Sequence, residues 1–215
     1  MARVRVNEIF HSIQGESTWA GRPCVFVRLT GCNLRCAWCD TAYAFYEGAQ
    51  MEIPAVIERV RSYGCQLVEL TGGEPLLQQG IHALIKALLV ENYEVLVETS
   101  GERDISTLDP HVIRIVDLKC PDSGEVERNL WTNIEHLNGR DEVKFVIASR
   151  RDYEWARSVL SEYRLEGRVN AVLMSPAFGL IKPVTLANWI LEDRLPARMQ
   201  LQMHKYIWDP DKRGV

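Results

Sequence analysis

Three cysteines in one short loop, Cys32, Cys36 and Cys39, constrain this chain more than any other feature of its sequence. Their spacing is C-x3-C-x2-C, and no fourth cysteine follows close behind. A structural zinc ion or a fully protein-ligated iron–sulfur cluster takes four side-chain ligands. Three thiolates on a four-iron cluster leave one iron open. The spacing therefore indicates a metal cluster on which a small molecule binds and reacts.

Two other interpretations of these cysteines have to be weighed. A zinc ion could take a distant histidine as its fourth ligand, although zinc sites usually pair their ligands as two short clips. Disulfides are less favoured, because the first residues lack an apolar leader and six cysteines are few for a stapled scaffold. Cys24, Cys65 and Cys120 lie in apolar surroundings and are expected to be small buried hydrophobic residues. Thiolate ligands imply a reducing, cytoplasmic setting.

Length and charge narrow the class of protein. A chain of 215 residues is long enough for one large domain, which we place at residues 1–215. No apolar run approaches the roughly 20 residues that span a bilayer. The net charge is −4 without a polybasic tract, so the chain lacks the electrostatic footprint of a nucleic-acid-binding protein. We therefore expect neither nucleic acid nor a membrane among its partners.

Short apolar strands alternate with helical patterns along the chain. We expect helices at Ile53–Tyr63, Gly80–Glu91, Arg151–Tyr163 and Pro183–Leu191. We expect strands at Val4–Phe10, Cys24–Leu29, Gln66–Leu70, Glu94–Glu98, Val112–Leu118, Glu142–Ala148, Val169–Met174 and Met199–His204. This alternation indicates an α/β fold with a mainly parallel sheet and outer helices. The chain is shorter than the roughly 250 residues of a closed eight-unit barrel. A partial, open TIM-like barrel is therefore predicted.

Polar motifs follow several of these strands. The cysteine loop comes after the second strand, and three further strands are followed by Thr71-Gly-Gly-Glu-Pro75, Thr99-Ser-Gly101 and Lys119-Cys-Pro-Asp122. Ligands of such folds bind at the C-terminal ends of the parallel strands. We therefore expect these loops to converge on one rim, where Gly72 and Gly73 let the backbone approach a ligand closely.

Together, the cysteine loop and Thr71-Gly-Gly-Glu-Pro75 resemble the radical S-adenosylmethionine (SAM) superfamily. The resemblance implies a modified radical SAM core in which Cys32, Cys36 and Cys39 each bind one iron of a [4Fe-4S] cluster. The amino and carboxylate groups of SAM would chelate the fourth iron. The residues expected to contact SAM are Ala37, Trp38, Asp40, Gly72, Gly73, Glu74, Ser100, Asp117, Lys119 and Ser175.

Further motifs narrow the resemblance. The segments Phe10-His-Ser-Ile-Gln-Gly-Glu16, Glu98-Thr-Ser-Gly101 and Gln202-Met-His-Lys-Tyr206 resemble the 7-carboxy-7-deazaguanine synthases, small radical enzymes of the queuosine pathway. This resemblance covers nearly the whole chain. It implies the ring contraction of 6-carboxy-5,6,7,8-tetrahydropterin to 7-carboxy-7-deazaguanine, with loss of ammonia, started by a 5′-deoxyadenosyl radical. It also implies an external electron donor such as flavodoxin, and a homodimer.

A pterin substrate is flat, guanine-like at one edge and anionic at another, so its site needs a binding group for each edge. A carboxylate can accept from both a 2-amino group and a ring N–H, and we assign that role to Glu16 beside Gln14. Arg28 lies in an apolar strand and needs an anionic partner, either the substrate carboxylate or a strand-end salt bridge. The full set of expected substrate contacts is Ile13, Gln14, Gly15, Glu16, Arg28, Thr71 and His204.

Thr41 follows the last cysteine of the loop by two positions. From its type and position beside Asp40 it would cap a turn. The resemblance instead implies that its hydroxyl binds a Mg²⁺ ion that bridges to the substrate carboxylate, with water completing the coordination.

Two competing functions share the cysteine loop. One is an activating enzyme that forms a glycyl radical on a partner protein, against which the Gln14-Gly-Glu16 and Gln202–Tyr206 segments argue. The other is a non-catalytic module that binds zinc. The metal content of anaerobically purified protein separates the zinc module from both radical enzymes.

Overall fold

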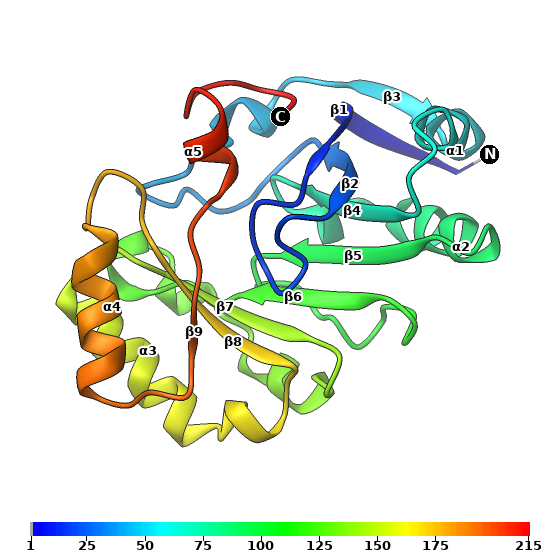
Figure 1. Cartoon of the computed structure of the whole chain (residues 1–215). Helices are drawn as coiled ribbons and strands as arrows, with labels where there is room; N and C mark the ends of the chain where they lie inside the picture. Colours follow the sequence, from blue (N-terminus) through cyan, green and yellow to red (C-terminus); the bar gives the residue numbers. More distant parts are fainter. Residues whose placement is uncertain (1) are drawn as a thin grey trace.

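A computed structural model describes residues 2–215 as one sheet flanked by helices (Figure 1). Its strands are β1 (Arg3–Ile13), β2 (Pro23–Leu29), β3 (Ala49–Glu52), β4 (Leu67–Gly72), β5 (Glu94–Thr99), β6 (Ile113–Asp117), β7 (Glu142–Ile147), β8 (Ala171–Pro176) and β9 (Arg198–Met199). The strand order is β3-β1-β2-β4-β5-β6-β7-β8-β9. Strands β2 and β4 to β9 pair in parallel, whereas β1 is antiparallel to β2 and β3. The predicted open, mainly parallel sheet is confirmed.

Within residues 2–215, five α-helices and six 3₁₀ turns lie between or after the strands. The helices are α1 (Ile53–Arg61), α2 (Ile81–Val90), α3 (Arg150–Glu162), α4 (Pro183–Glu192) and α5 (His204–Ile207). The turns are η1 (Ala42–Phe45), η2 (Pro75–Leu77), η3 (Pro121–Ser123), η4 (Val126–Arg128), η5 (Trp131–His136) and η6 (Leu165–Gly167). The four helices predicted from the sequence match α1 to α4. Within residues 2–215, none of the helices has the length and apolar character to cross a membrane.

Local sequence explains where these helices begin. Pro54 and Pro183 stand in the first turns of α1 and α4, where the missing proline N–H has no helical partner to lose. Ser149 precedes α3, and its hydroxyl accepts a hydrogen bond of 3.3 Å from the backbone N–H of Asp152. A serine in this position satisfies one of the free donors at a helix start.

The two faces of the sheet have different surroundings. On the outer face, strand residues such as Val68 and Val97 share one apolar cluster with Val56 of α1, Leu84 of α2 and Val159 of α3. A second, smaller cluster lies on the inner face and consists of Phe10, Cys24, Phe26, Leu67, Leu96, Ile113 and Ile115. The helices therefore cover the outer face of the sheet and not the inner face of the partial barrel.

The inner face is layered along the strand direction. Side chains alternate between the faces of a sheet, so Leu67, Glu69 and Thr71 follow one another on the inner side of β4. Strand β5 continues in the same way, with Leu96 in the apolar floor and Glu98 above it. The inner face therefore has three layers, which are an apolar floor, a charged middle layer and a polar rim at the C-terminal strand ends.

One predicted strand is wrong for most of its length. The strand expected at Met199–His204 ends at Met199, and His204 is the first residue of α5. The N–H of Gln200 still bonds to Met174 O at 3.0 Å, but the N–H of Met203 bonds to Gly15 O at 2.9 Å, outside the sheet. Because β9 is an edge strand, no neighbour on its other side continues the pairing. The short strand β3, which pairs with β1 alone, was not predicted.

Candidate active site

The loops at the C-terminal strand ends meet, as the sequence predicted. The N–H of Gly73 bonds to Leu29 O at 3.2 Å, and that of Glu74 bonds to Gly31 O at 2.7 Å. The N–H of Ser100 bonds to the carboxylate of Glu74 at 2.7 Å. The loops after β2, β4 and β5 are thus joined directly by hydrogen bonds into one rim.

The three loop cysteines are free thiols that are each half-buried. The N–H of Leu34 bonds to Cys32 Sγ at 3.4 Å, and that of Cys39 bonds to Cys36 O at 3.1 Å. Burial raises the pKa of all three thiols, that of Cys36 to about 11. The positive charge of Lys119 lowers the pKa of each, so this buried ammonium lies near all three sulfurs.

This donor set fits an iron–sulfur cluster better than a zinc ion. Within residues 2–215, no three His, Cys, Asp or Glu side chains come together closely enough to hold one metal ion. A four-iron cluster distributes its thiolate ligands over separate irons and does not require them to meet at a point. Lys119 supplies a positive charge beside the three thiolates that such a cluster needs.

Gly72 and Gly73 shape the rim through close backbone contacts. A Cβ atom on Gly72, whose φ is +147°, would lie 2.2 Å from Leu29 O. A Cβ atom on Gly73 would lie 2.2 Å from Gly31 O and 2.8 Å from Cys32 Cβ. Both glycines are therefore needed to seat the cysteine loop, and their contact with SAM stays a prediction.

Glu74 is a fully buried carboxylate that binds the rim together. It accepts hydrogen bonds from Leu76 N at 3.0 Å, Thr99 Oγ1 at 2.8 Å and Ser100 Oγ at 2.6 Å. Both of its oxygens are occupied by the protein itself. A direct role of Glu74 or Ser100 toward SAM stays a prediction.

The remaining expected SAM contacts lie in three places. Ala37 and Trp38 belong to the cysteine loop, where the N–H of Ala37 bonds to the carbonyl of Ser123 at 3.0 Å. Asp117 pairs with Lys119 at 2.9 Å through one oxygen, while its buried Oδ1 has no partner within the described residues. An unpaired acceptor of this kind suits a donor group on a ligand. Ser175 of β8 accepts a hydrogen bond from Gln200 Nε2 at 2.8 Å, and its contact with SAM stays a prediction.

The loop of Gln14, Gly15 and Glu16 lies on the opposite side of the interior. Lys144 of β7 pairs with Glu16 at 3.0 Å, and Gln202 Nε2 donates to the same carboxylate at 3.1 Å. Burial by itself would raise the pKa of Glu16. Lys144, His204 and Gln202 outweigh that effect and hold the pKa below its usual value. Glu16 is therefore a charged acceptor in a mostly enclosed position.

The C-terminal segment closes onto this loop. In addition to the bond from Met203 N to Gly15 O, a Cβ atom on Gly15 would lie 2.4 Å from His204 Nδ1. Only glycine allows α5 to approach the loop this closely. His204 therefore stands beside Glu16, from a helix rather than the predicted strand, and its contact with the substrate stays a prediction. Burial lowers the pKa of His204, against the opposing charges of Glu16 and Asp40.

Arg28 is held by a protein partner. Its Nε donates to Glu8 Oε1 at 2.8 Å, and Tyr43 Oη donates to the same oxygen at 2.9 Å. The two terminal guanidinium nitrogens make no hydrogen bond within residues 2–215. Thr71 lies opposite Arg28 in the sheet register, and Ile13 ends β1 opposite Pro23. The salt bridge that the sequence left open is present, and binding of a substrate carboxylate stays a prediction.

Thr41 and Asp40 link the cysteine loop to the C-terminal segment. Thr41 Oγ1 donates to Asp40 Oδ1 at 2.9 Å. The other oxygen of Asp40 accepts from Lys205 Nζ at 2.6 Å and from Gln202 Nε2 at 3.2 Å. Burial would raise the pKa of Asp40, but Lys205 holds it far below its usual value. Whether Thr41 binds Mg²⁺ stays a prediction.

Sequence reasoning missed three charged residues in the middle layer. Glu69 is 2% exposed and Lys144 is 5% exposed, and both lie within the interior together with Glu98. Each is a charged side chain at an alternate position of an otherwise apolar strand. That pattern places a charge in the core and could have identified all three.

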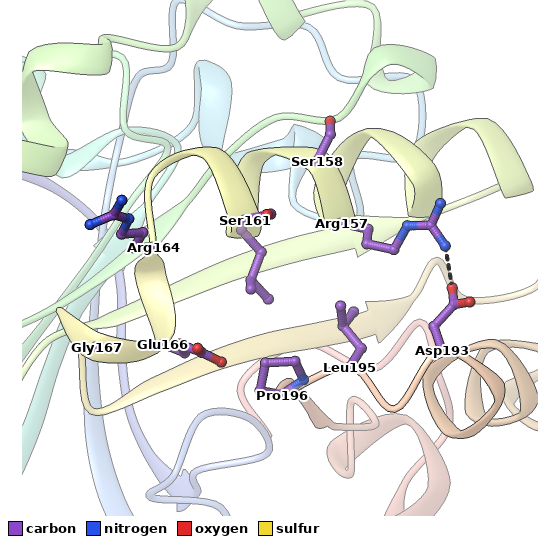
Figure 2. A pocket seen from close by; sticks show the side chains of 10 residues that line it. Arg157, Ser158, Ser161, Arg164, Glu166, Gly167, Asp193, Leu195 and Pro196 are labelled. Atoms are coloured by element: carbon purple, nitrogen blue, oxygen red, sulfur yellow. Dashed lines mark hydrogen bonds and ion pairs between the residues drawn. The ribbon is translucent and has the colours of Figure 1, made fainter.

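A hollow of about 950 Å³ lies elsewhere, along α3 and the segment before β9 (Figure 2). Its ion pair is Arg157–Asp193 at 2.6 Å, and Arg164 and Glu166 add charges of both signs. None of the expected site residues lines it, so it offers no route to the cysteine rim.

The sequence of the chain, including the residues of this rim, is similar to those of known proteins. The sequence pattern of the Radical SAM superfamily matches residues 26–164. The chain is 48% identical to the 7-carboxy-7-deazaguanine synthase of Chlorobaculum tepidum, over 100% of this chain and 98% of that protein. It is 46% identical to the 7-carboxy-7-deazaguanine synthase of Koribacter versatilis, over 99% of this chain and 100% of that protein. This chain belongs to the 7-carboxy-7-deazaguanine synthase family.

Solved structures show the same fold. QueE from Escherichia coli matches with a TM-score of 0.77 at 24% identity, over 94% of this chain and 95% of that one. SuiB from Streptococcus suis, bound to the precursor peptide SuiA, matches with a TM-score of 0.59 at 13% identity. That match covers 82% of this chain and 47% of SuiB. The partial barrel of the 7-carboxy-7-deazaguanine synthases is thus confirmed.

As a radical SAM lyase of the 7-carboxy-7-deazaguanine synthase family, the protein uses a [4Fe-4S] cluster and SAM. Its place is in queuosine and 7-deazapurine biosynthesis. Of the functions that the sequence left open, these relatives support the synthase rather than a glycyl-radical activating enzyme or a zinc module.

Proposed function

We propose that the chain, as one radical SAM domain over residues 1–215, converts 6-carboxy-5,6,7,8-tetrahydropterin to 7-carboxy-7-deazaguanine with loss of ammonia. One observation carries the choice of substrate. The charged carboxylate of Glu16 is held in the interior beside the amide of Gln14 and the imidazole of His204. An acceptor fixed in this way suits the 2-amino group and ring N–H of a pterin.

The opposite edge of the pterin carries its carboxylate, for which Arg28 has the matching chemistry. Glu8 uses Nε alone, so the two terminal nitrogens, unpartnered within residues 2–215, can form a planar, bidentate contact. Thr71 lies next to Arg28 across the sheet and adds a hydroxyl at the same edge. Glu16 and Arg28 would thus fix the two ends of the ring system and set its orientation.

We propose that Mg²⁺ assists at the carboxylate edge through the hydroxyl of Thr41. A hard divalent cation prefers oxygen ligands and keeps several waters, so one protein oxygen and one substrate oxygen are sufficient anchors. Asp40 accepts the proton of the Thr41 hydroxyl, so the lone pairs of that oxygen stay available to a cation.

The rim would hold the cofactor against this pocket. When bound, the cluster and SAM supply the radical chemistry that removes a hydrogen atom from the substrate. Cys32, Cys36 and Cys39 would bind the cluster, and Lys119 would offset part of its negative charge. Asp117 Oδ1, which is buried and unpaired within the described residues, would accept a hydrogen bond from SAM. The glycines at 72 and 73 keep the loop close to β2.

Three further features complete the proposal and come from the family resemblance. An external donor such as flavodoxin would reduce the cluster. Two chains would form a homodimer. The free, half-buried thiols of the loop would require the reducing conditions of the cytoplasm.

The decisive experiment is a reconstitution under anaerobic conditions. Purified protein is loaded with iron and sulfide, then incubated with SAM, reductant and 6-carboxy-5,6,7,8-tetrahydropterin. We expect 7-carboxy-7-deazaguanine by mass spectrometry, with faster formation when Mg²⁺ is added. Cleavage of SAM without any deazaguanine product would contradict the proposed substrate.

A further inference from the structure

A closed circuit of hydrogen bonds runs through the charged middle layer. Gln14 Nε2 donates to the carboxyl of Glu69, which is in hydrogen-bond contact with Glu98. Glu98 pairs with Lys144, and Lys144 pairs with Glu16 at 3.0 Å. The N–H of Glu16 donates to Gln14 Oε1 at 2.8 Å and closes the circuit. We call these five residues the interior ring.

The interior ring joins distant parts of the chain. Glu69, Glu98 and Lys144 come from β4, β5 and β7, which form the fixed wall of the barrel. Gln14 and Glu16 come from the loop after β1, which the proposed function assigns to pterin recognition. The interior ring therefore links strands β4, β5 and β7 to the loop that we assign to substrate binding.

Charge balance in the ring requires a proton on one carboxyl. Glu69 and Glu98 are in hydrogen-bond contact, and one of two such carboxyl groups must donate. Lys144 has only one charge, which Glu16 and Glu98 already share at its ammonium, with Asp117 a third carboxylate at 3.7 Å. Glu69 has no salt bridge within residues 2–215 and is almost fully buried. The shared proton therefore belongs on Glu69.

The surroundings of Glu69 also favour its protonated form. Burial raises the pKa of Glu69 well above its usual value, and the charges of Glu98 and Glu16 raise it further. Lys144 opposes this shift without cancelling it. On the side of β2, Cys24 lies against Glu69, and burial raises the pKa of that thiol so that it stays neutral. The neighbouring groups described here thus compensate an ionised Glu69 only in part, through Lys144.

We propose that Glu69 is a neutral carboxylic acid that donates its proton to Glu98 and, as a positioning residue, holds the Gln14–Glu16 loop in place for the substrate. The role of this loop in pterin binding rests on the proposed function. The protonation of Glu69 and the order of the loop do not, because they are properties of the chain without substrate.

Two substitutions of Glu69 separate its geometry from its proton. In Glu69→Gln the amide nitrogen can donate to Glu98 while the amide oxygen accepts from Gln14, which reproduces a neutral acid. Glu69→Leu removes both bonds, so Gln14 Nε2 loses its acceptor and Glu98 keeps Lys144 alone of its two partners in the ring. We expect Glu69→Leu to weaken equilibrium binding of the pterin roughly tenfold or more. Glu69→Gln should restore that binding, and it should also preserve binding at alkaline pH, where the native acid ionises.

A matched control comes from Asp152 on α3, a buried carboxyl group whose pKa burial also raises. Its side chain accepts hydrogen bonds from the backbone N–H groups of Asp122 and Ala148, outside the interior ring and the loop after β1. Asp152→Asn should leave pterin binding and the order of the Gln14–Glu16 loop unchanged. Basal cleavage of SAM without the pterin should be equal in the native protein and in this control.

Infrared spectroscopy and hydrogen exchange provide readouts that need no substrate. The carbonyl stretch of a protonated carboxylic acid should be present in the native protein and lost in Glu69→Gln. Exchange at the N–H of Glu16 should be faster in Glu69→Leu than in Glu69→Gln. If Glu69→Gln loses no acid band, or weakens pterin binding as strongly as Glu69→Leu, the proposal is wrong. If the acid band and the slow exchange are present but the native protein binds no pterin, the proposed substrate fails and the neutral Glu69 stands.

Discussion

The cysteine rim and the Gln14–Glu16 side of the interior are built in different ways. The rim is made of short contiguous motifs whose backbones bond to one another, as Gly73 does to Leu29 and Glu74 does to Gly31. The opposite side depends on side-chain charges from β4, β5, β7 and the C-terminal segment. A contiguous motif can be recognised in a sequence, whereas a network assembled from distant residues is visible only after folding.

The difference also predicts how each side responds to substitution. Removing a cluster ligand from the rim leaves nothing to replace it, so the effect should be complete. Changes on the opposite side remove one bond of several, so their effects should be graded and sensitive to pH. Four experiments test this contrast, in order of decreasing effect.

Cys36→Ala should have the largest effect. Loss of one of three thiolate ligands should abolish the iron–sulfur absorption or leave it labile, and turnover should cease. Visible absorption, iron content and product formation are measured together. Cys65→Ala is the control, since this half-buried thiol bonds to the carbonyls of Pro23 and Leu67 and packs on apolar residues outside the cysteine loop. Normal turnover by Cys36→Ala would refute the assignment of the rim.

Substitution of Glu16 or Arg28 by alanine should weaken pterin use while the cluster stays intact. A buried hydrogen bond to a charged group contributes about 1.5–3 kcal/mol, which corresponds to roughly 10- to 150-fold in affinity. Arg28→Lys keeps the charge but not the planar fork, so it should also weaken binding. The Michaelis constant for the pterin and the rate of SAM cleavage without it are measured. Unchanged pterin affinity in both alanine variants would place the pocket elsewhere.

Thr41→Val should have a smaller effect, confined to the metal response. The substitution is nearly isosteric and removes only the hydroxyl oxygen that we assign to Mg²⁺. Turnover with and without added Mg²⁺ is compared in the two proteins at equal cluster content. An equal stimulation by Mg²⁺ in both would show that Thr41 is a turn residue only.

The smallest effect should be on stability at acidic pH. The pKa of His204 is lowered on folding from 6.5, chiefly by burial, so the unfolded chain binds a proton more readily. Stability should therefore fall as the pH drops below about 6.5, because protonation favours the unfolded state. Urea unfolding at pH 7 and pH 5 measures the loss. His204→Asn should reduce this loss, and an equal loss in both proteins would exclude His204 as its source.

The sequence anticipated the fold and the rim closely for physical reasons. Apolar strands of β-branched residues and amphipathic helices carry a local periodic signal, and α1 to α4 lie where that signal placed them. The strand predicted after Met199 was wrong because the course of this segment is set by a partner distant in sequence, the carbonyl of Gly15. No local pattern encodes such a contact.

The interior ring shows the same limit for the site. Glu16 and Gln14 stood out because they form part of a motif, but their partners Glu69, Glu98 and Lys144 are single charges inside strands. Which of these strand charges face one another depends on the strand order, and the order places β4, β5 and β7 around one interior. Strand order follows from the whole chain rather than from any segment.

The contact between Gly15 and α5 has a consequence for the folding of the protein during its synthesis on the ribosome. The cluster ligands and the glycine loop are synthesised more than a hundred residues before Gln202, His204 and Lys205. A chain released before these residues would carry every thiol needed for the cluster and lack the segment that closes over Glu16. Synthesis through Lys205 is therefore needed before the interior can enclose a substrate beside the cluster.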